Sequence, residues 1–131
     1  MAPRIETVTS FAKGLGVLKC FGGGRRRQTI TEVAERTGMT RAAARRFLYT
    51  LCEEGLARSD GKHFELTPAV LEIGHAYLSS VTELETVRDL LQDLTADLGE
   101  SASAAMIDEG DIVYVARSPA RHRVMTIGLG I

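Results

Sequence analysis

The sequence has no long apolar run and very little cysteine. No stretch of about 18 consecutive apolar residues is present, and the segment around Glu6 has no continuous apolar core, so we expect neither a membrane partner nor a secretory signal. The two cysteines, Cys20 and Cys52, lie 32 positions apart without partners at metal-finger spacing. We expect both to be small buried hydrophobic residues, with a redox switch as the alternative. The sequence therefore predicts a cytoplasmic protein of one or two small domains.

The residues needed for common enzyme chemistry are also missing. His63, His75 and His122 have no cysteine or carboxylate at ligand or relay spacing, so no catalytic triad or metal site is expected. The glycine-rich stretch 22–28 lacks the lysine-serine/threonine ending of a phosphate-binding loop, and Gly128-Leu129-Gly130 is only half of a dinucleotide fingerprint. We predict a protein that is not an enzyme and uses no cofactor.

Charge is divided unevenly along the chain. Residues 1–67 contain 12 Lys and Arg against 7 Asp and Glu, a balance of +5, whereas residues 68–131 contain 4 against 10, a balance of −6. Seven of the 12 cations are arginines between Arg25 and Arg46. Such a density can displace condensed counterions from a nucleic-acid backbone, so double-stranded DNA is the expected partner and binding should weaken as salt rises.

Two helices joined by a glycine turn follow a first helix predicted from an N-cap at Ser10 to the glycines at 22–24. Thr29 and Glu32 form a capping-box pattern, although Thr31 is an equally good cap, and Val33 and Ala34 should face the core. Gly38 can adopt the positive φ that ends this helix, and Thr40 can cap the next one. This spacing predicts a helix-turn-helix.

The second helix of the pair, 40–54, has one apolar and one cationic face. Its apolar residues recur at helical spacing: Ala44, Phe47, Leu48 and Leu51. The opposite face combines guanidinium groups with small residues that permit close approach to a groove. The candidate DNA contacts on this helix are Thr40, Arg41, Ala42, Ala43, Arg45, Arg46 and Tyr49. Neighbouring helical positions diverge by about 100°, so we expect one of Arg45 and Arg46 to read a guanine and the other to grip phosphate.

A hairpin should follow this helix. Residues 56–58 and 63–66 are predicted strands, and Asp60-Gly61 predicts a two-residue turn between them. Arg58 and Lys62 lie near its tip, where they either keep the hairpin soluble or contact phosphate; the preceding arginine-rich helix favours phosphate contact. Arg26 and Arg27, in the loop before the helix pair, belong either to a solvated connector or to auxiliary phosphate contacts.

Several short motifs occur in the order and spacing of a known family. They are Ser10-Phe11-Ala12-Lys13-Gly14-Leu15, Thr37-Gly38-Met39-Thr40, Arg46-Phe47-Leu48, Gly55-Leu56 and Leu66-Thr67-Pro68. In these the chain resembles the IclR-type bacterial transcriptional regulators. The segment 123–129 resembles the branch that controls aromatic-acid catabolism, the protocatechuate and 4-hydroxybenzoate regulators. The resemblance implies a winged helix-turn-helix domain at 1–67, a linker and dimerisation helix at 68–81, and the start of an α/β effector-binding domain at 82–131.

The second half shows patterns compatible with this organisation. Thr67 can cap a helix with Pro68 in its first turn; its apolar residues favour contact with a dimer partner. Thr82, with Glu85 as a capping box, begins a helix whose leucine seam favours packing on a sheet within the chain. Strands are predicted at 102–107 and 112–117, around an acidic turn that lacks the ligand spacing of a calcium loop.

The carboxy terminus ends on Ile131 after an apolar, strand-like run. The resemblance implies that most of the effector domain lies beyond it, so we expect effector response to be absent or impaired and apolar surfaces to be exposed. The effector-binding residues are unknown. Arg117, Arg121 and Arg123 could bind the carboxylate of an effector, but we favour a solvated or structural role for them.

These observations predict a mainly α protein with a β wing that regulates transcription, in the branch for aromatic-acid catabolic genes. It should act on palindromic or repeated operators as a homodimer, or as a tetramer formed from two dimers. Full-length relatives should bind a small aromatic acid as effector. The alternative is a winged-helix module that binds another protein; such a module would tolerate replacement of Arg45 and Arg46.

Overall fold

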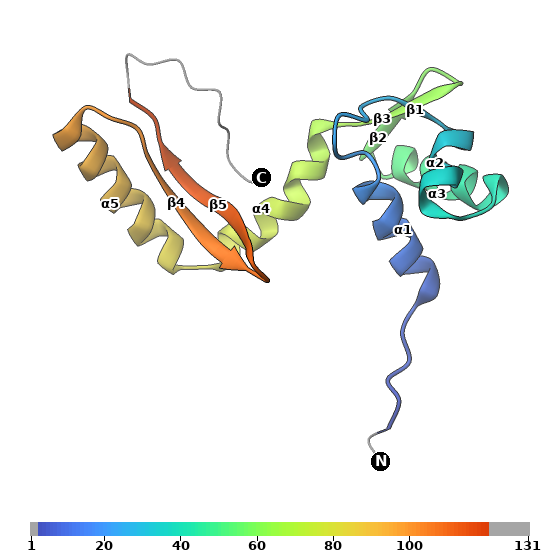
Figure 1. Cartoon of the computed structure of the whole chain (residues 1–131), viewed down its shortest axis with the longest axis horizontal. Coiled ribbons are helices and arrows are strands. Elements are labelled where there is room, and N and C mark those ends of the chain that lie inside the picture. Colours follow the sequence, from blue (N-terminus) through green and yellow to red (C-terminus); the bar gives the residue numbers. More distant parts are fainter. Residues whose placement is uncertain (1–2, 121–131) are drawn as a thin grey trace. The chain divides into compact units, whose positions relative to one another are not determined.

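The computed structural model describes residues 3–120 and divides after Val70 into two compact units, each of which is considered by itself. The first unit contains three helices and a small antiparallel sheet (Figure 1). Its elements are α1 (Thr9–Lys19), β1 (Gln28–Thr29), α2 (Ile30–Thr37), α3 (Arg41–Glu53), β2 (Ala57–Ser59), β3 (His63–Leu66) and the 3-10 turn η1 (Pro68–Val70). The mainly α fold with a β wing, predicted from the sequence, is confirmed.

One apolar core holds the first unit together. Its members come from all three helices and the sheet, and those with no exposed surface are Val17, Val33, Ala44, Leu48 and Phe64. Burying a valine, leucine or phenylalanine side chain stabilises a fold by roughly 1.5–3 kcal/mol. The predicted core positions of α2 and α3 are therefore correct, whereas Phe11 and Leu15 of α1 remain exposed.

The helix ends follow the polar residues before α2 and α3. The Thr29 hydroxyl accepts a hydrogen bond from the Glu32 backbone N–H at 3.2 Å, and the Glu32 carboxylate accepts one from the Thr29 N–H at 3.2 Å. Gly38 ends α2 with φ of 72°, and the Thr40 hydroxyl accepts from the Ala43 N–H at 3.1 Å. These caps are confirmed. The Ser10 cap was wrong, because α1 begins at Thr9 without any side-chain cap.

The predicted two-residue turn at Asp60-Gly61 was also wrong. Such a turn would place Arg58 opposite His63, but the observed register pairs Arg58 with Glu65. The reason is the Asp60 carboxylate, whose Oδ1 accepts hydrogen bonds from the backbone N–H groups of Lys62 at 3.0 Å and His63 at 2.7 Å. An aspartate that satisfies two amides in this way stabilises a longer loop.

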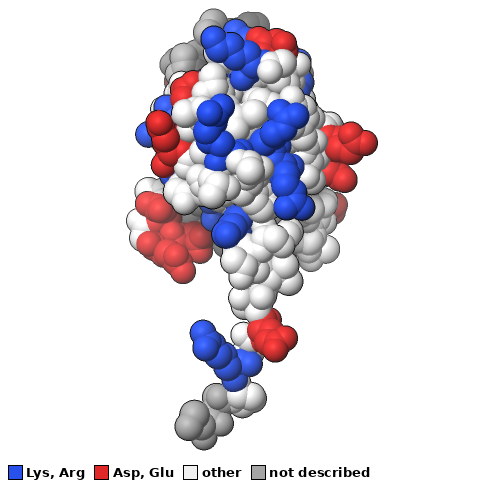
Figure 2. Space-filling view, turned by 90° about the vertical axis from the view of Figure 1, so that its right-hand side faces the viewer, with Lys and Arg blue, Asp and Glu red and all other residues white. Residues whose placement is uncertain are grey.

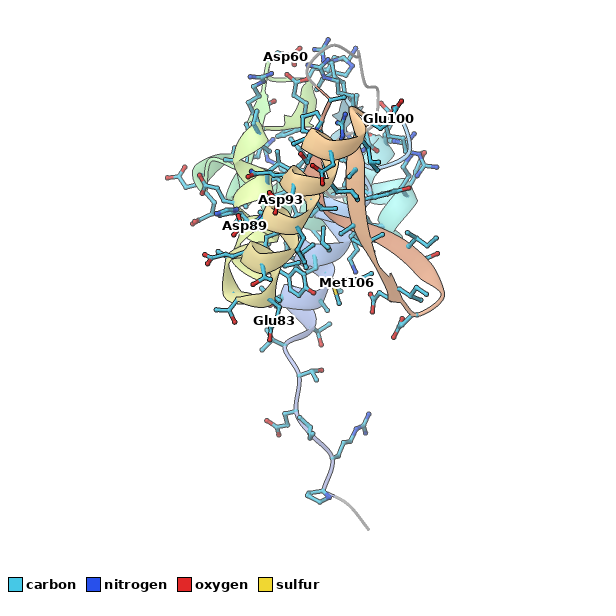
Figure 3. The ribbon with its side chains drawn as sticks, turned by 90° about the vertical axis from the view of Figure 1, so that its left-hand side faces the viewer. Asp60, Glu83, Asp89, Asp93, Glu100 and Met106 are labelled. Atoms are coloured by element: carbon cyan, nitrogen blue, oxygen red, sulfur yellow. The ribbon has the colours of Figure 1, made fainter. Side chains whose placement is uncertain are left out.

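The second unit consists of two helices and a hairpin: α4 (Leu71–Ser80), α5 (Glu83–Leu98), β4 (Ala102–Asp108) and β5 (Asp111–Ser118). The hairpin and its acidic turn are confirmed, and α5 packs on both strands, as expected for its leucine seam. Leu84 and Leu91 are buried, whereas Glu83, Asp89 and Asp93 lie along the exposed side of α5 (Figure 3).

Two capping predictions in this half fail. Thr82 has helical backbone angles and makes no cap, because the turn before α5 already continues into the helix. The Thr67 hydroxyl donates to the Gly55 carbonyl at 2.6 Å, and the helix after it begins as a 3-10 turn. Among residues 3–120, no helix is both long and apolar enough to cross a membrane. Arg121, Arg123, His122, the segment 123–129 and the glycines at 128–130 lie outside the described residues.

Candidate nucleic-acid interface

Helix α3 exposes the arginines that the sequence assigned to DNA. Its apolar side enters the core through Ala44, Leu48 and Leu51. The residues on its outer side that are exposed to solvent are Arg41, Ala42, Arg45, Arg46 and Tyr49; Thr40 is exposed at the cap and Ala43 is half-buried. The predicted contact residues of α3 therefore lie on one accessible side of one capped helix.

The arginines predicted to contact DNA, considered together with Arg36, fall into two groups. Four take part in ion pairs within the unit: Arg26 with Glu65 at 3.4 Å, Arg27 with Asp60 at 2.7 Å, Arg36 with Glu32 at 3.9 Å, and Arg58 with Glu65 at 2.6 Å. Within residues 3–120, no ion pair involves Arg41, Arg45 or Arg46. The cations of α3 thus remain available to an external anion.

The wing gathers three of the predicted contacts around two carboxylates. Arg26 and Arg58 both reach Glu65, while Arg27 reaches Asp60 at the loop. Lys62 lies exposed in the same loop, and its side chain has no ion pair among the described residues. The assignment of Arg26, Arg27, Arg58 and Lys62 to DNA stays a prediction, in which phosphate would compete with internal carboxylates.

Gln28 is the structurally important residue that the sequence did not reveal. Its side chain is completely buried, and its amide donates to the carbonyls of Cys20 at 3.1 Å and Arg25 at 3.3 Å. The guanidinium of Arg36 donates to its Oε1. Gln28 therefore joins the end of α1, the arginine loop and α2, and it places β1 beside β3. No local sequence signal marks this role; only the opposite charges of Arg58 and Glu65 could have indicated the hairpin register.

Tyr49 links α3 to the wing. Its ring meets the buried Phe64 ring edge to face, with centroids 5.3 Å apart and planes at 87°. The guanidinium carbon of Arg45 lies 4.8 Å from the Tyr49 ring centroid. Both distances are in the range of favourable aromatic and cation–π contacts. Arg45 is therefore oriented by a neighbour, whereas the Arg46 side chain makes no ion pair or ring contact within residues 3–120.

Figure 2 shows the side of the molecule that lies at the right in Figure 1. Lys and Arg side chains gather over the middle of the visible face, and acidic groups lie mostly at its edges.

Three carboxylates of the first unit have pKa values below their ordinary values. Backbone amides lower the pKa of Asp60, the Arg58 side chain lowers that of Glu65, and the Thr29 backbone lowers that of Glu32. All three are thus firmly ionised at neutral pH.

The lowered pKa of Glu65 makes a pH-dependent prediction. A lowered folded-state pKa means that the ionised carboxylate contributes stability above the unfolded-chain pKa, near about 4.3, and that this contribution is lost as the pH falls through the folded-state value. Glu65→Gln should therefore unfold at a lower urea concentration than the unchanged chain at pH 7. At a pH below the folded-state pKa of Glu65, the two proteins should unfold at nearly the same urea concentration. Glu35→Gln is the control, because Glu35 is exposed and has no ion pair within residues 3–120. An equal loss for Glu65→Gln at both pH values would contradict the assignment.

The described residues contain no cluster of three or more His, Cys, Asp or Glu able to hold a metal ion. Cys20 and Cys52 are half-buried against the core, and burial raises the pKa of both thiols. They are less enclosed than predicted, but both pack with apolar neighbours.

Comparison with known proteins agrees with this arrangement. A family model described as the IclR helix-turn-helix domain matches residues 10–61. The Pca regulon regulatory protein of Pseudomonas putida is 40% identical over 126 residues, which are 96% of this chain and 43% of that protein. The chain belongs to the IclR family. The p-hydroxybenzoate hydroxylase transcriptional activator of Acinetobacter baylyi is 41% identical over 86% of this chain and 42% of its own length.

A solved structure extends the likeness of this IclR-family chain to three dimensions. A protein of Rhodococcus sp. RHA1 superposes with a TM-score of 0.81 at 43% identity, covering 95% of this chain and 50% of that one. The chain thus spans less than half the length of the curated relatives named above. Those relatives are named as regulators of transcription or of a regulon, which agrees with the helix-turn-helix domain matched at residues 10–61.

Proposed function

We propose that this chain binds double-stranded DNA through α3 and, as part of a transcriptional regulator, recognises a specific operator. The carrying observation is that Arg41, Arg45 and Arg46 are exposed on one capped helix while the wing arginines are held by carboxylates. An α-helix fits the major groove, where an arginine can donate two hydrogen bonds to guanine. Unpaired guanidinium groups on such a helix are suited to this contact.

The first test measures which arginines contribute to binding. Duplexes are selected from a random pool with the 131-residue chain, and the affinity of Arg45→Ala and Arg46→Ala for the selected duplex is then measured at several salt concentrations. Loss of a bidentate base contact should cost roughly 1–3 kcal/mol and relax specificity. Loss of a phosphate contact should weaken all sequences and reduce the salt slope by about one.

A matched control removes the same charge elsewhere. Arg88→Ala lies on α5, outside the helix-turn-helix, and should leave affinity and salt slope unchanged. Unchanged affinity in both α3 variants would remove this helix from the interface and favour the alternative, a winged-helix module that binds another protein. Enrichment of no sequence at all would contradict the operator proposal.

The proposed assembly is a homodimer formed through α4. No residue of this helix is buried, and Leu71, Ile73 and Tyr77 are exposed by 69%, 53% and 48%. Apolar side chains in such numbers on one helix favour contact with a partner surface. Two-fold symmetry would place two recognition helices about 34 Å apart, so the selected duplex should contain an inverted repeat.

The proposed targets are genes of aromatic-acid catabolism. The support is the pair of relatives at 40% and 41% identity, one named for the Pca regulon and one for p-hydroxybenzoate hydroxylase. A small aromatic acid is the corresponding effector class for the full-length protein. Binding of the chain to promoter fragments of aromatic-acid catabolic genes, compared with promoters of unrelated genes, tests this assignment; equal binding to both sets would contradict it.

A further inference from the structure

Tyr49 contacts only one of two neighbouring arginines of α3 among the described residues: Arg45 lies over its ring, and Arg46 does not. Arg45 and Tyr49 are four positions apart, so they lie on the same side of the helix. Long helical side chains lean toward the amino terminus, which carries the Tyr49 ring over the turn of Arg45. The observed 4.8 Å between the guanidinium carbon and the ring centroid is the result.

The ring that supports Arg45 is itself fixed from behind. Tyr49 contacts Phe64 edge to face, and Phe64 is fully buried in the core. Phe64 is also held on both sides by the sheet, because its backbone faces Gln28 of β1 and Ser59 of β2. A series of contacts therefore connects the apolar core to the Arg45 guanidinium: Phe64 lies in the core, Tyr49 packs on Phe64, and Arg45 lies over Tyr49.

Arg46 lacks such support. Its side chain is exposed and makes no ion pair or aromatic contact among the described residues. Only its backbone takes part in a hydrogen bond with a neighbouring side chain: the Thr50 hydroxyl donates to the Arg46 carbonyl at 2.8 Å within the described residues. A phosphate tolerates many approach directions, whereas two parallel hydrogen bonds to a guanine edge require a guanidinium plane in a fixed orientation.

We propose that Tyr49 is a positioning residue that orients Arg45 for base reading, and that Arg46 contacts the DNA backbone. The proposal rests on the DNA-binding function proposed above and deepens it. Tyr49 acts here through its ring and not through its hydroxyl, so it does not itself need to touch DNA. The wing then affects sequence recognition through Phe64, even where its own cations contact only phosphate.

The test compares two replacements of Tyr49 on the selected duplex. Tyr49→Phe keeps both ring contacts and should bind within about 2-fold of the unchanged chain. Tyr49→Leu removes the ring and should weaken binding about 3- to 10-fold, the range expected for a cation–π contact at a partly desolvated site. The salt slope should stay the same in both variants, because no phosphate contact is lost.

Specificity provides the second readout. Binding is measured on duplexes that carry each of the four base pairs at the position where Arg45→Ala relaxes preference, and Tyr49→Leu should relax that same position. In an Arg45→Ala background, Tyr49→Leu should have less than about 2-fold further effect, because coupled residues are not additive. Helix content by circular dichroism shows that each variant remains folded.

Three results would overturn the proposal. An equal loss in Tyr49→Phe would show that the hydroxyl contacts DNA. A full additional loss in the Arg45→Ala background would show that Tyr49 acts independently of Arg45. Relaxed specificity in Arg46→Ala but not in Arg45→Ala would reverse the two assignments. Each leaves DNA binding by α3 intact, whereas failure of the function itself would appear as unchanged affinity in both arginine variants.

Discussion

Replacing Phe64 by alanine is expected to lower the free energy of unfolding of the first unit by roughly 3–5 kcal/mol. The side chain has no exposed surface and contacts the core shared by the three helices. The change removes buried apolar area, leaves a cavity, and takes away the ring that supports Tyr49. A small domain has a stability of only about 5–15 kcal/mol, so much of it is lost in one step. Urea denaturation followed by hydrogen exchange of the α3 amides measures the effect.

The control makes the same chemical change at an exposed position. Phe11→Ala on α1, where the side chain is 67% exposed, should shift the free energy of unfolding by less than about 0.5 kcal/mol. If the two replacements lowered the free energy of unfolding equally, Phe64 would not be the centre of the core. Phe64→Ala should also lose DNA binding, but that loss would result from unfolding of the first unit. Tyr49→Leu changes an exposed side chain and leaves the core in place.

The parts of this fold that the sequence predicted are those with local causes. A threonine three residues before Glu32, a glycine that can adopt φ of 72°, and a threonine before α3 each determine a helix end through bonds within four residues. The apolar spacing of α3 likewise follows from helical geometry alone. The helix-turn-helix was predictable because its whole pattern lies within 25 consecutive residues.

Apart from the local failures of the caps at Ser10 and Thr82, the features that the sequence did not predict depend on interactions between separate segments. Strand β1 exists because Gln28, eight residues before Arg36 and eight after Cys20, satisfies polar groups of three segments at once. The wing turn was misassigned because Asp-Gly favours a two-residue turn, while the Asp60 carboxylate accepts two backbone amides and also meets Arg27, 33 positions away. A propensity for a turn cannot include a partner of that separation.

The sequence predicted which arginines share the exposed side of α3, but not which of the other arginines form internal ion pairs. Counting arginines gave equal weight to the loop, the helix and the wing, because every guanidinium has the same charge in a sequence. The structure distinguishes them by their partners: Glu65 and Asp60 pair with Arg26, Arg27 and Arg58, whereas the Arg45 guanidinium lies over the Tyr49 ring. Surface ion pairs contribute about 0–1 kcal/mol, so a phosphate can displace them at small cost. In the proposed interface we therefore expect the wing arginines to be additional phosphate contacts and α3 to be the principal contact.

The second large effect concerns the proposed dimer. Ile73→Asp places a charge on the exposed apolar side of α4 and should convert a dimer into monomers, as measured by sedimentation equilibrium. Two linked binding domains gain about 10²- to 10⁴-fold in affinity over one, because the second contact becomes intramolecular. The variant should therefore bind a duplex with two half-sites at least about 100-fold more weakly, yet bind a single half-site as before.

The control, Ser79→Asp, adds the same charge at an exposed position of the same helix, about 120° around it from Ile73 and about 160° from Tyr77, since consecutive positions diverge by about 100°. It should leave both assembly and binding unchanged. If Ile73→Asp remains dimeric, the exposed side of α4 is not the dimer contact. If it becomes monomeric and still binds the two-site duplex at full affinity, each chain recognises DNA alone, and the repeat in the operator would then reflect independent occupation instead of a linked pair of α3 helices.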